Sequence, residues 1–213
     1  MFWNDTEARR YLEENGLPHD PRSHVLKKMT MAASFLKGSA VLDVGCGEGH
    51  LYPFIKDKVE KYVGLDASSD MIKVAKSFSP EASWMLGNVY DLGEVDMTDT
   101  VYSISLLIHL KDQEEAIRQL WSRAIQRLVF LIPIQSEDEV IDVRPGLIYH
   151  QTTFDRLKAI IESLKGFKQY SIRPLSDLRP RIKFKLGLLP STVRLHYFVV
   201  IDRDQQTSQE MKS

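Results

Sequence analysis

A glycine-rich turn between a short apolar strand and a helix constrains the fold of this chain more than any other feature. The segment reads Val41-Leu-Asp-Val-Gly-Cys-Gly-Glu-Gly-His50, with Gly45, Gly47 and Gly49 at alternate positions. Glycine allows positive φ and lets the backbone approach a ligand closely. The N-terminus of a following helix offers unpaired N–H groups to a carboxylate or phosphate. The motif therefore predicts a ligand-binding turn at a strand end, with a purely structural turn as the alternative.

Short apolar runs alternate with amphipathic helical patterns along most of the chain. The predicted strands are 40–44, 61–65, 83–86, 100–106, 128–134, 167–173 and 194–201; the predicted helices are 20–36, 50–58, 69–78, 112–128 and 153–165. Five strand–helix units followed by a helix-free strand pair predict a doubly wound, Rossmann-like α/β fold. We expect a seven-stranded sheet, mostly parallel with one antiparallel edge strand, and helices on both faces.

Two helix starts are marked by capping residues. Asp20-Pro21 has the form of an N-cap followed by proline at the first helical position. Asp112-Gln-Glu-Glu115 has a capping-box arrangement, with an acceptor at the cap and Glu three residues later. We therefore expect helices to begin at both places.

An acidic residue ends the second predicted strand. Asp66 closes the run Val63-Gly-Leu-Asp66, 17 residues after Gly49. An acid at this place can accept hydrogen bonds from both hydroxyls of a ribose, whereas the structural alternative is a helix cap. The glycine spacing is G-x-G-x-G rather than the dinucleotide pattern G-x-G-x-x-G, which disfavours a nicotinamide-dependent oxidoreductase.

Composition excludes several classes of protein. The 213 residues carry a net charge of −1, and no apolar stretch approaches the roughly 18 residues of a membrane-spanning helix. The N-terminus holds four charged residues among its first ten, unlike a secretory signal. The single cysteine, Cys46, cannot form an internal disulfide, and no Cys/His cluster has zinc spacing. We expect a cytoplasmic protein with no membrane span and no metal.

Four segments together carry a family resemblance: Asp43–Gly49, Gly64–Asp66, Gly87–Asn88 and Ser103–Asp112. The chain resembles the class I S-adenosylmethionine-dependent methyltransferases. It is closest in pattern to the branch typified by the ubiquinone and menaquinone biosynthesis methyltransferases. The resemblance covers roughly residues 38–135 and is looser at both ends, where substrate recognition usually resides.

The resemblance implies a cofactor role for particular residues. The glycine loop would hold the methionine part of S-adenosylmethionine, Asp43 would help to place its ammonium group, and Asp66 would take the ribose hydroxyls. Asn88 stands where the family has an acid that reads the adenine amino group, and an amide oxygen can still accept that bond. The implied cofactor residues are Asp43, Gly45, Cys46, Gly47, Gly49, Asp66, Ala67, Met71, Asn88, Val89, Ser103 and Leu106.

The resemblance also divides the chain. It implies a single methyltransferase domain over 1–202, made of N-terminal helices in 1–37, a cofactor-binding core in 38–135 and a C-terminal part in 136–202. The polar tail 203–213 is expected to be disordered. The aromatic residues Phe2, Trp3 and Tyr11, on a short helix before the core, either close over the ligand or pack on the sheet edge.

The reaction implied is direct transfer of a methyl group to a small-molecule acceptor. Such a transfer needs alignment more than a catalytic group, and a base only where the acceptor must lose a proton. His109, which matches a histidine of the family pattern, is the candidate base; the alternative is a histidine that caps or packs the next helix.

A basic segment bears on the acceptor. Residues 164–194 hold eight basic residues and one acid, and Arg179-Pro-Arg-Ile-Lys-Phe-Lys185 alternates cationic and apolar side chains. This basic ribbon is either solvated surface or a rim for an anionic acceptor, nucleic acid or membrane surface. We expect a small-molecule acceptor, with an RNA-directed methyltransferase and a cofactor-binding protein without transferase activity as alternatives. The oligomeric state cannot be read from the sequence.

Overall fold

The computed structural model describes residues 5–135, 140–144, 147–175, 195–204 and 207. Its helices are α1 (Asp5–Asn15), α2 (Ser23–Ala33), α3 (Tyr52–Ile55), α4 (Ser69–Phe78), α5 (Gln113–Arg123) and α6 (Phe154–Glu162), with short 3₁₀ helices η1 (Lys56–Lys58) and η2 (Leu107–His109). Its strands are β1 (Gly16–Leu17), β2 (Asp20–Pro21), β3 (Ala40–Val44), β4 (Lys61–Asp66), β5 (Ser83–Leu86), β6 (Thr98–Ile104), β7 (Ala124–Gln135), β8 (Val140–Arg144), β9 (Leu147–His150), β10 (Thr152–Thr153), β11 (Phe167–Pro174) and β12 (Leu195–Arg203). The basic ribbon 179–185 and most of the predicted tail lie outside the described residues.

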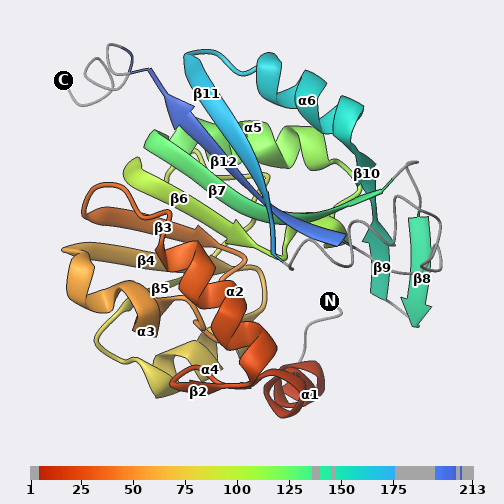
Figure 1. The fold of residues 1–213 in the computed structure, drawn as a ribbon. Helices are drawn as coiled ribbons and strands as arrows, with labels where there is room; N and C mark the ends of the chain where they lie inside the picture. The colour runs from red at the N-terminus through yellow and green to blue at the C-terminus, as the bar shows by residue number, and fades with distance from the viewer. Residues whose placement is uncertain (1–4, 136–139, 145–146, 176–194, 205–206, 208–213) are drawn as a thin grey trace.

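The central sheet has the strand order β11-β12-β7-β6-β3-β4-β5, with β10 paired to β7 (Figure 1). Neighbouring strands from β7 to β5 are parallel, and β12 is antiparallel to both of its neighbours. The antiparallel strand is therefore present, but it lies one place in from the edge that the sequence analysis assigned to it. The α6 crossover carries β11 past the position next to β7, and β12 then fills that gap.

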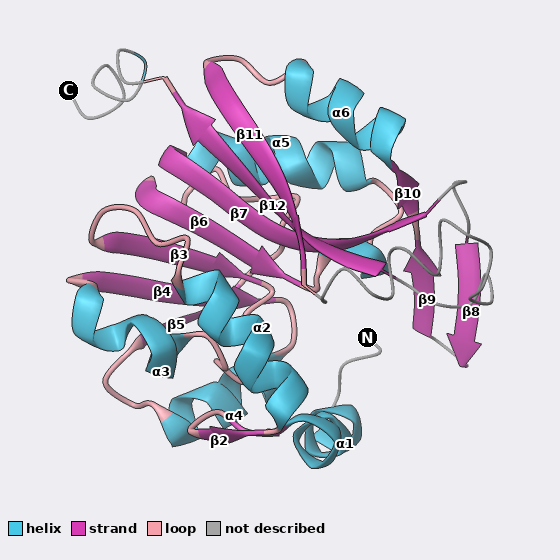
Figure 2. Ribbon diagram, viewed as in Figure 1, coloured by secondary structure: helices cyan, strands magenta, loops and turns pink. Residues whose placement is uncertain are grey.

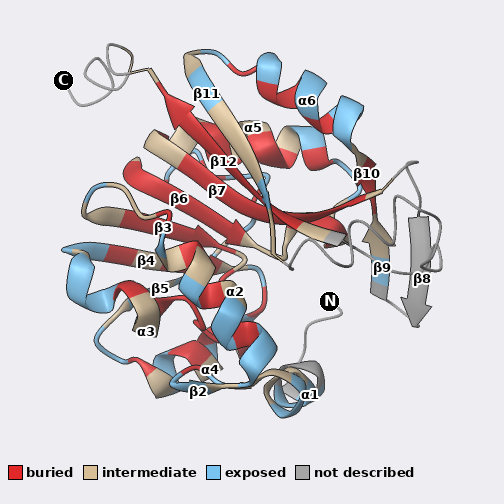
Figure 3. Cartoon of the chain, in the orientation of Figure 1, coloured by how far each residue is buried: buried red, intermediate tan, exposed pale blue. Residues whose placement is uncertain are grey.

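Helices cover both faces of the sheet (Figure 2). One core cluster joins α2 and α3 to residues such as Val41, Tyr102 and Phe198. The other joins α5 and α6 to residues such as Leu42 and Phe130. Figure 3 shows buried residues concentrated along the central strands, with exposed residues on the outer sides of the helices. Burial on two faces explains why β7 carries the continuous apolar run Leu128–Ile134 rather than an alternation of apolar and polar residues.

Of the two helix starts predicted from capping residues, the one at Asp112 is confirmed and the one at Asp20-Pro21 is wrong. Helix α4 covers the predicted 69–78, with the Ser68 side chain accepting the Met71 N–H at 3.3 Å. Helix α5 begins after Asp112, whose side chain accepts the Glu115 N–H at 3.0 Å. The prediction at Asp20-Pro21 is wrong: these residues pair with Gly16–Leu17 as β2, so they are extended and α2 begins at Ser23.

A partly buried ion pair holds β12 against β7. Arg127 donates to both carboxylate oxygens of Asp202, at 2.7 and 3.1 Å, and to the Phe35 carbonyl at 3.0 Å. A two-pronged arginine–carboxylate contact fixes geometry as well as charge. Strand β12 continues through Arg203, one residue beyond the predicted domain end at 202, and the Arg203 guanidinium lies 4.0 Å over the Trp121 ring.

None of the helices in the described parts of the chain is long and apolar enough to cross a bilayer.

Candidate cofactor site

A pocket of about 460 Å³ opens at the carboxyl ends of β3, β4, β5 and β6. The chain passes from β3 outward to β4 and β5, and then returns to place β6 on the other side of β3. In parallel α/β sheets this switch in direction leaves a crevice in which ligands bind. The lining residues are Tyr11, Val44, Gly45, Gly47, Glu48, Leu65, Asp66, Ala67, Ser68, Met71, Gly87, Asn88, Val89, Ile104, Ser105, Leu106, His109, Leu110, Lys111, Ile148 and His150.

The glycine loop after β3 forms one wall of the pocket. Gly45, Gly47 and Gly49 all have positive φ, at 74°, 54° and 84°. A Cβ on Gly45 would lie 2.8 Å from Leu106 Cβ, and one on Gly49 would lie 2.4 Å from the Trp84 ring. A Cβ on Gly47 would meet nothing within 4 Å. Of these three glycines, Gly47 is therefore the one whose backbone faces open space.

Asp66 lies opposite this loop at the end of β4. Its Oδ2 accepts the Gly47 N–H at 3.0 Å, and its Oδ1 accepts the Ser68 N–H at 2.8 Å. Burial raises the pKa of Asp66, while the N–H groups of Ser68, Gly47 and Ala67 oppose that shift. Each oxygen keeps a further lone pair for a ligand. The acid and the loop that the sequence analysis linked are thus joined in one pocket.

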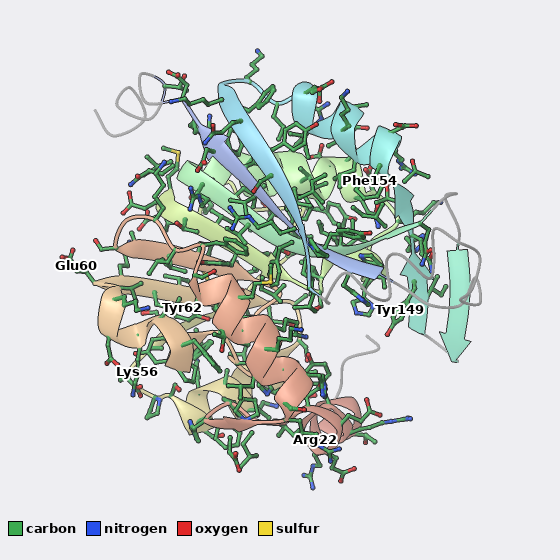
Figure 4. The ribbon with its side chains drawn as sticks, in the orientation of Figure 1. Arg22, Lys56, Glu60, Tyr62, Tyr149 and Phe154 are labelled. Carbon is green, nitrogen blue, oxygen red and sulfur yellow. The ribbon has the colours of Figure 1, made fainter. Side chains whose placement is uncertain are left out.

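Four predicted cofactor residues do not line the pocket. Asp43 is buried beneath the loop, where its Oδ2 accepts the hydroxyl of Tyr62 at 2.9 Å and burial raises its pKa to about 7 (Tyr62 is labelled in Figure 4). Cys46 and Ser103 are also buried away from it, and Gly49 faces Trp84 instead. Of the glycine loop, Gly45, Gly47 and Glu48 line the pocket, so only part of the loop can face a ligand.

The remaining predicted residues at the far end of the pocket do line it. Met71 on α4 is 4% exposed and contributes to both the helix interior and the pocket wall. Asn88 and Val89 follow β5, and Asn88 Oδ1 accepts the Tyr90 N–H at 3.0 Å. This bond leaves the amide nitrogen of Asn88 as the group that is not engaged by the turn.

The other end of the pocket is formed after β6 and by β9. Ser105 adopts φ of 69°, an uncommon value for a residue other than glycine, and Leu106 and His109 follow it along the wall. Burial, with a smaller contribution from His150, lowers the pKa of His109 to about 4. The Tyr149 ring packs edge-on against His109, with centroids 5.1 Å apart, and projects from β9 toward the body of the domain (Figure 4).

Tyr11 reaches the pocket from α1, which agrees with the first of the two placements that the sequence left open for it. Glu48 lines the pocket without having been predicted. Glu48 lies inside the glycine motif, but glycine spacing predicts nothing about the residues between the glycines. Its side chain is 1% exposed, a signal that only the structure provides. Among the described residues, no cluster of three or more His, Cys, Asp or Glu side chains has the arrangement of a metal site.

The pocket fits an adenosine-type ligand with an amino-acid tail. The open space at Gly47 admits a ligand against the backbone, and Asp66 offers acceptor lone pairs beside it. Glu48 contributes a buried carboxyl whose Oε1 has no hydrogen-bond partner among the described residues. An unpaired buried acceptor is costly unless a ligand completes it.

Comparisons with known proteins agree with this geometry. Residues 41–126 match the family model described as a methyltransferase domain. The tRNA U34 carboxymethyltransferase of Idiomarina loihiensis is 30% identical over 155 residues, which cover 64% of this chain and 48% of that protein. The trans-aconitate 2-methyltransferase of Azoarcus sp. is 19% identical over 120 residues, covering 55% of this chain and 45% of that protein.

A solved structure has the same fold. Magnesium protoporphyrin IX methyltransferase from Synechocystis PCC 6803, with bound S-adenosylhomocysteine, superposes with a TM-score of 0.60 at 20% identity, covering 84% of this chain and 80% of that one. The chain spans about half the length, or less, of the curated relatives it matches. The resemblance to the ubiquinone and menaquinone branch stays a prediction. Residues 41–126 thus match a methyltransferase domain, and the fold of the chain is similar to that of the class I S-adenosylmethionine-dependent methyltransferases.

Proposed function

We propose that the chain binds S-adenosylmethionine in this pocket and transfers its methyl group to a small-molecule acceptor. The observation that carries the proposal is the joining of the glycine loop to Asp66, with Gly47 donating to Asp66 Oδ2 beside open space. This arrangement supports a ligand that lays its ribose on the acid and its amino-acid tail along the loop. The adenine would then lie between Met71 and Val89.

The bound cofactor supplies a methyl group made electrophilic by its positively charged sulfur. The protein's task is to align an acceptor lone pair with that methyl group and to keep water away. Apolar side chains of Ile104, Leu106, Leu110 and Ile148 line the acceptor end of the pocket. They favour desolvation of the acceptor over attack by water.

His109 lies at this end and is the candidate proton acceptor. Because burial lowers its pKa to about 4, the imidazole is neutral near pH 7 and able to take a proton from an acceptor hydroxyl or amine. The same low pKa makes it a weak base, so orientation of the acceptor is the larger part of its proposed role.

The charge of the pocket supports a small acceptor. Among the described residues that line it, Lys111 carries the one permanently positive side chain. RNA binding draws on several Lys or Arg contacts to phosphates, whereas one lysine suits a single carboxylate or phosphate.

An RNA acceptor is the second candidate, supported by the tRNA-modifying relative and by the basic residues of 164–194. The alignment covers 64% of this chain and 48% of that protein, so about half of the relative has no counterpart in this chain. Cytoplasmic location stays a prediction.

Calorimetry tests the cofactor part of the proposal. S-adenosylhomocysteine should bind and NAD should not; binding of NAD alone would refute it. Formation of S-adenosylhomocysteine from S-adenosylmethionine, measured with pools of small acids and with total tRNA, then tests transfer. Turnover with neither pool, despite cofactor binding, would favour the cofactor-binding protein without transferase activity.

A salt titration separates the two kinds of acceptor. An RNA affinity should fall steeply with salt, because each neutralised phosphate releases counterion, whereas a small anion should show a shallow slope. Replacing Arg179, Arg181, Lys183 and Lys185 together by Gln should leave cofactor binding unchanged. Loss of transfer to tRNA alone in that variant would favour the second candidate.

A further inference from the structure

Glu48 is a buried acid inside the glycine loop for which the fold provides no complete set of partners. It lies between Gly47 and Gly49, lines the pocket, and is 1% exposed. Its Oε1 has no hydrogen-bond partner among the residues that the structure describes. Buried carboxyls are normally paired or hydrogen-bonded, so this atom is a vacant acceptor at the pocket wall.

The neighbouring histidine does not supply a positive charge. His50 Nε2 lies 2.9 Å from the Gly16 carbonyl, which can only accept, so Nε2 carries a proton. In the neutral ring the other nitrogen, Nδ1, then presents a lone pair, and it lies 3.8 Å from Glu48 Oε2. Burial lowers the pKa of His50 to about 4, which keeps the ring neutral at physiological pH.

Other charged and titratable groups face Glu48 from each surrounding element. Lys28 on α2 favours the ionised form, and Asp66 at the end of β4 opposes it. Burial raises the pKa of Tyr11 on α1 and of Cys46 in the loop, and the negative charge of Glu48 raises both further. For Glu48 itself, burial outweighs the effects of its own backbone N–H and of Lys28, and raises its pKa to about 8. The carboxyl is therefore mainly protonated at pH 7 when no ligand is present.

We propose that Glu48 is a specificity-determining residue that recognises the α-ammonium group of the cofactor's methionine part at Oε1. The inference rests on the proposed function and adds a residue to it. The loop on which Glu48 lies is the wall where that part of the cofactor is placed. A positively charged sulfur has no N–H donor and so cannot complete a vacant hydrogen-bond acceptor, whereas an ammonium group can.

Recognition of a cation by a protonated acid is coupled to loss of a proton. The neutral Glu48 carboxyl and the ligand ammonium become a carboxylate–ammonium pair, and one proton leaves to solvent. The positive ligand replaces the proton as the partner of the carboxylate, so binding should lower the pKa of Glu48. Cofactor binding should then release protons near neutral pH.

Calorimetry with two ligands isolates this contact. S-adenosylhomocysteine carries the ammonium group and no charged sulfur; 5′-methylthioadenosine lacks the amino-acid part altogether. The variant Glu48→Gln keeps the shape and the neutrality of the protonated acid. We expect it to weaken S-adenosylhomocysteine about 10- to 100-fold and 5′-methylthioadenosine less than about threefold.

Proton release provides a second readout. Titrations in buffers of different ionisation enthalpy should show between about half and one proton released per S-adenosylhomocysteine bound to the wild type at pH 7, and close to none for 5′-methylthioadenosine or for Glu48→Gln. Glu60→Gln, which changes an exposed acid (labelled in Figure 4), serves as the matched control and should behave as the wild type.

The outcomes distinguish this inference from the proposed function. If the wild type binds neither ligand, the proposed function fails. If it binds both, and Glu48→Gln leaves S-adenosylhomocysteine affinity unchanged, weakens both ligands equally, or leaves proton release intact, the role of Glu48 is overturned and the cofactor site stands.

Discussion

The backbone N–H of Gly47 donates to Asp66 Oδ2 at 3.0 Å, which ties the turn after β3 to the carboxylate that ends β4. The two residues are 19 positions apart, and each stands at the carboxyl end of its strand. Because β3 and β4 are parallel neighbours, their ends meet at the same edge of the sheet. The bond both shapes the loop and leaves acceptor lone pairs directed at a ligand.

Replacing Asp66 by Ala should weaken cofactor binding strongly. Hydrogen bonds to a charged group contribute about 1.5–3 kcal/mol each, so loss of the ribose contacts should lower S-adenosylhomocysteine affinity by about 10- to 100-fold or more. Two backbone N–H groups also lose their acceptor, and the free energy of unfolding should fall by about 1–3 kcal/mol. Calorimetry and urea denaturation measure the two effects.

The exposed Asp57 on η1 provides the control for that variant, since Asp57→Ala should alter neither quantity. Unchanged cofactor affinity in Asp66→Ala would show that Asp66 acts as a structural cap of the β4–α4 turn and not as a ligand.

Alanine at Gly47 should separate binding from stability. The added methyl group meets no protein atom within 4 Å, so the stability cost is that of positive φ alone, about 1–2 kcal/mol. The methyl group would project into the space assigned to the cofactor and should lower S-adenosylhomocysteine affinity at least tenfold. Thermal denaturation and calorimetry on the same samples distinguish these effects.

Alanine variants at two further glycines serve as comparisons for Gly47→Ala. Gly45→Ala adds a clash with Leu106 to the strain of positive φ and should destabilise the fold more than Gly47→Ala. Gly93→Ala, also in open space but outside the pocket, should leave binding unchanged. Equal affinities in Gly47→Ala and Gly93→Ala would contradict the placement of the cofactor.

Asn88→Asp should change preference for the base. Asn88 Oδ1 already accepts the Tyr90 N–H, which leaves the amide nitrogen as donor. An aspartate would keep that bond and present a second oxygen as acceptor to the adenine amino group. We expect a few-fold gain in the ratio of S-adenosylhomocysteine to S-inosylhomocysteine affinity. A ratio that stays constant would indicate that residue 88 does not contact the base edge.

His109 should make stability dependent on pH in the acid range. Its pKa is lowered from 6.5 to about 4, so between these values the unfolded chain binds a proton that the folded chain does not. The resulting contribution of His109 to the free energy of unfolding is fully present above pH 6.5 and is lost as the pH falls toward about 4. The variant His109→Asn should therefore lose less stability than the wild type between pH 7 and pH 4.5 in urea denaturation.

Kinetics on the same variant tests its chemical role. If His109 takes a proton from the acceptor, kcat should fall by about 100-fold or more in His109→Asn, and the wild-type rate should not decline between pH 8 and pH 6 through this residue. A rise in acceptor KM with kcat unchanged would instead indicate a purely positioning residue.

Local signals in the sequence predicted most strands of the central sheet and part of the site, although the predicted helix 112–128 ends at Arg123 and β7 begins at Ala124. Helix α4 follows its prediction residue for residue because Ser68 caps it and an apolar face runs along it. The glycine loop and Asp66 were recognisable because their roles depend on short-range spacing and on the ends of strands. Both kinds of signal act between residues that are near neighbours in the chain, so no tertiary contact is needed to read them.

Only the tertiary structure decided which residues meet at the pocket. Tyr11, His109 and His150 come from three distant segments and converge because β9 contacts η2 and α1 lies beside α4. Asp43 does not line the pocket, and its Oδ2 accepts the hydroxyl of Tyr62 on the neighbouring strand β4. These outcomes depend on packing between segments far apart in sequence.

The position of the antiparallel strand was decided in the same way. Strand composition predicts that β11 and β12 exist, and the missing helix between them predicts an antiparallel pair. Their order depends on how far the α6 crossover carries the chain across the sheet, and Arg127 on β7 then binds Asp202 on β12. Periodicity and capping in the sequence predicted most of the strands and helices of the core, and the ends of some of them. The long-range pairings among strands, which no local pattern encodes, determined which side chains face the cofactor pocket.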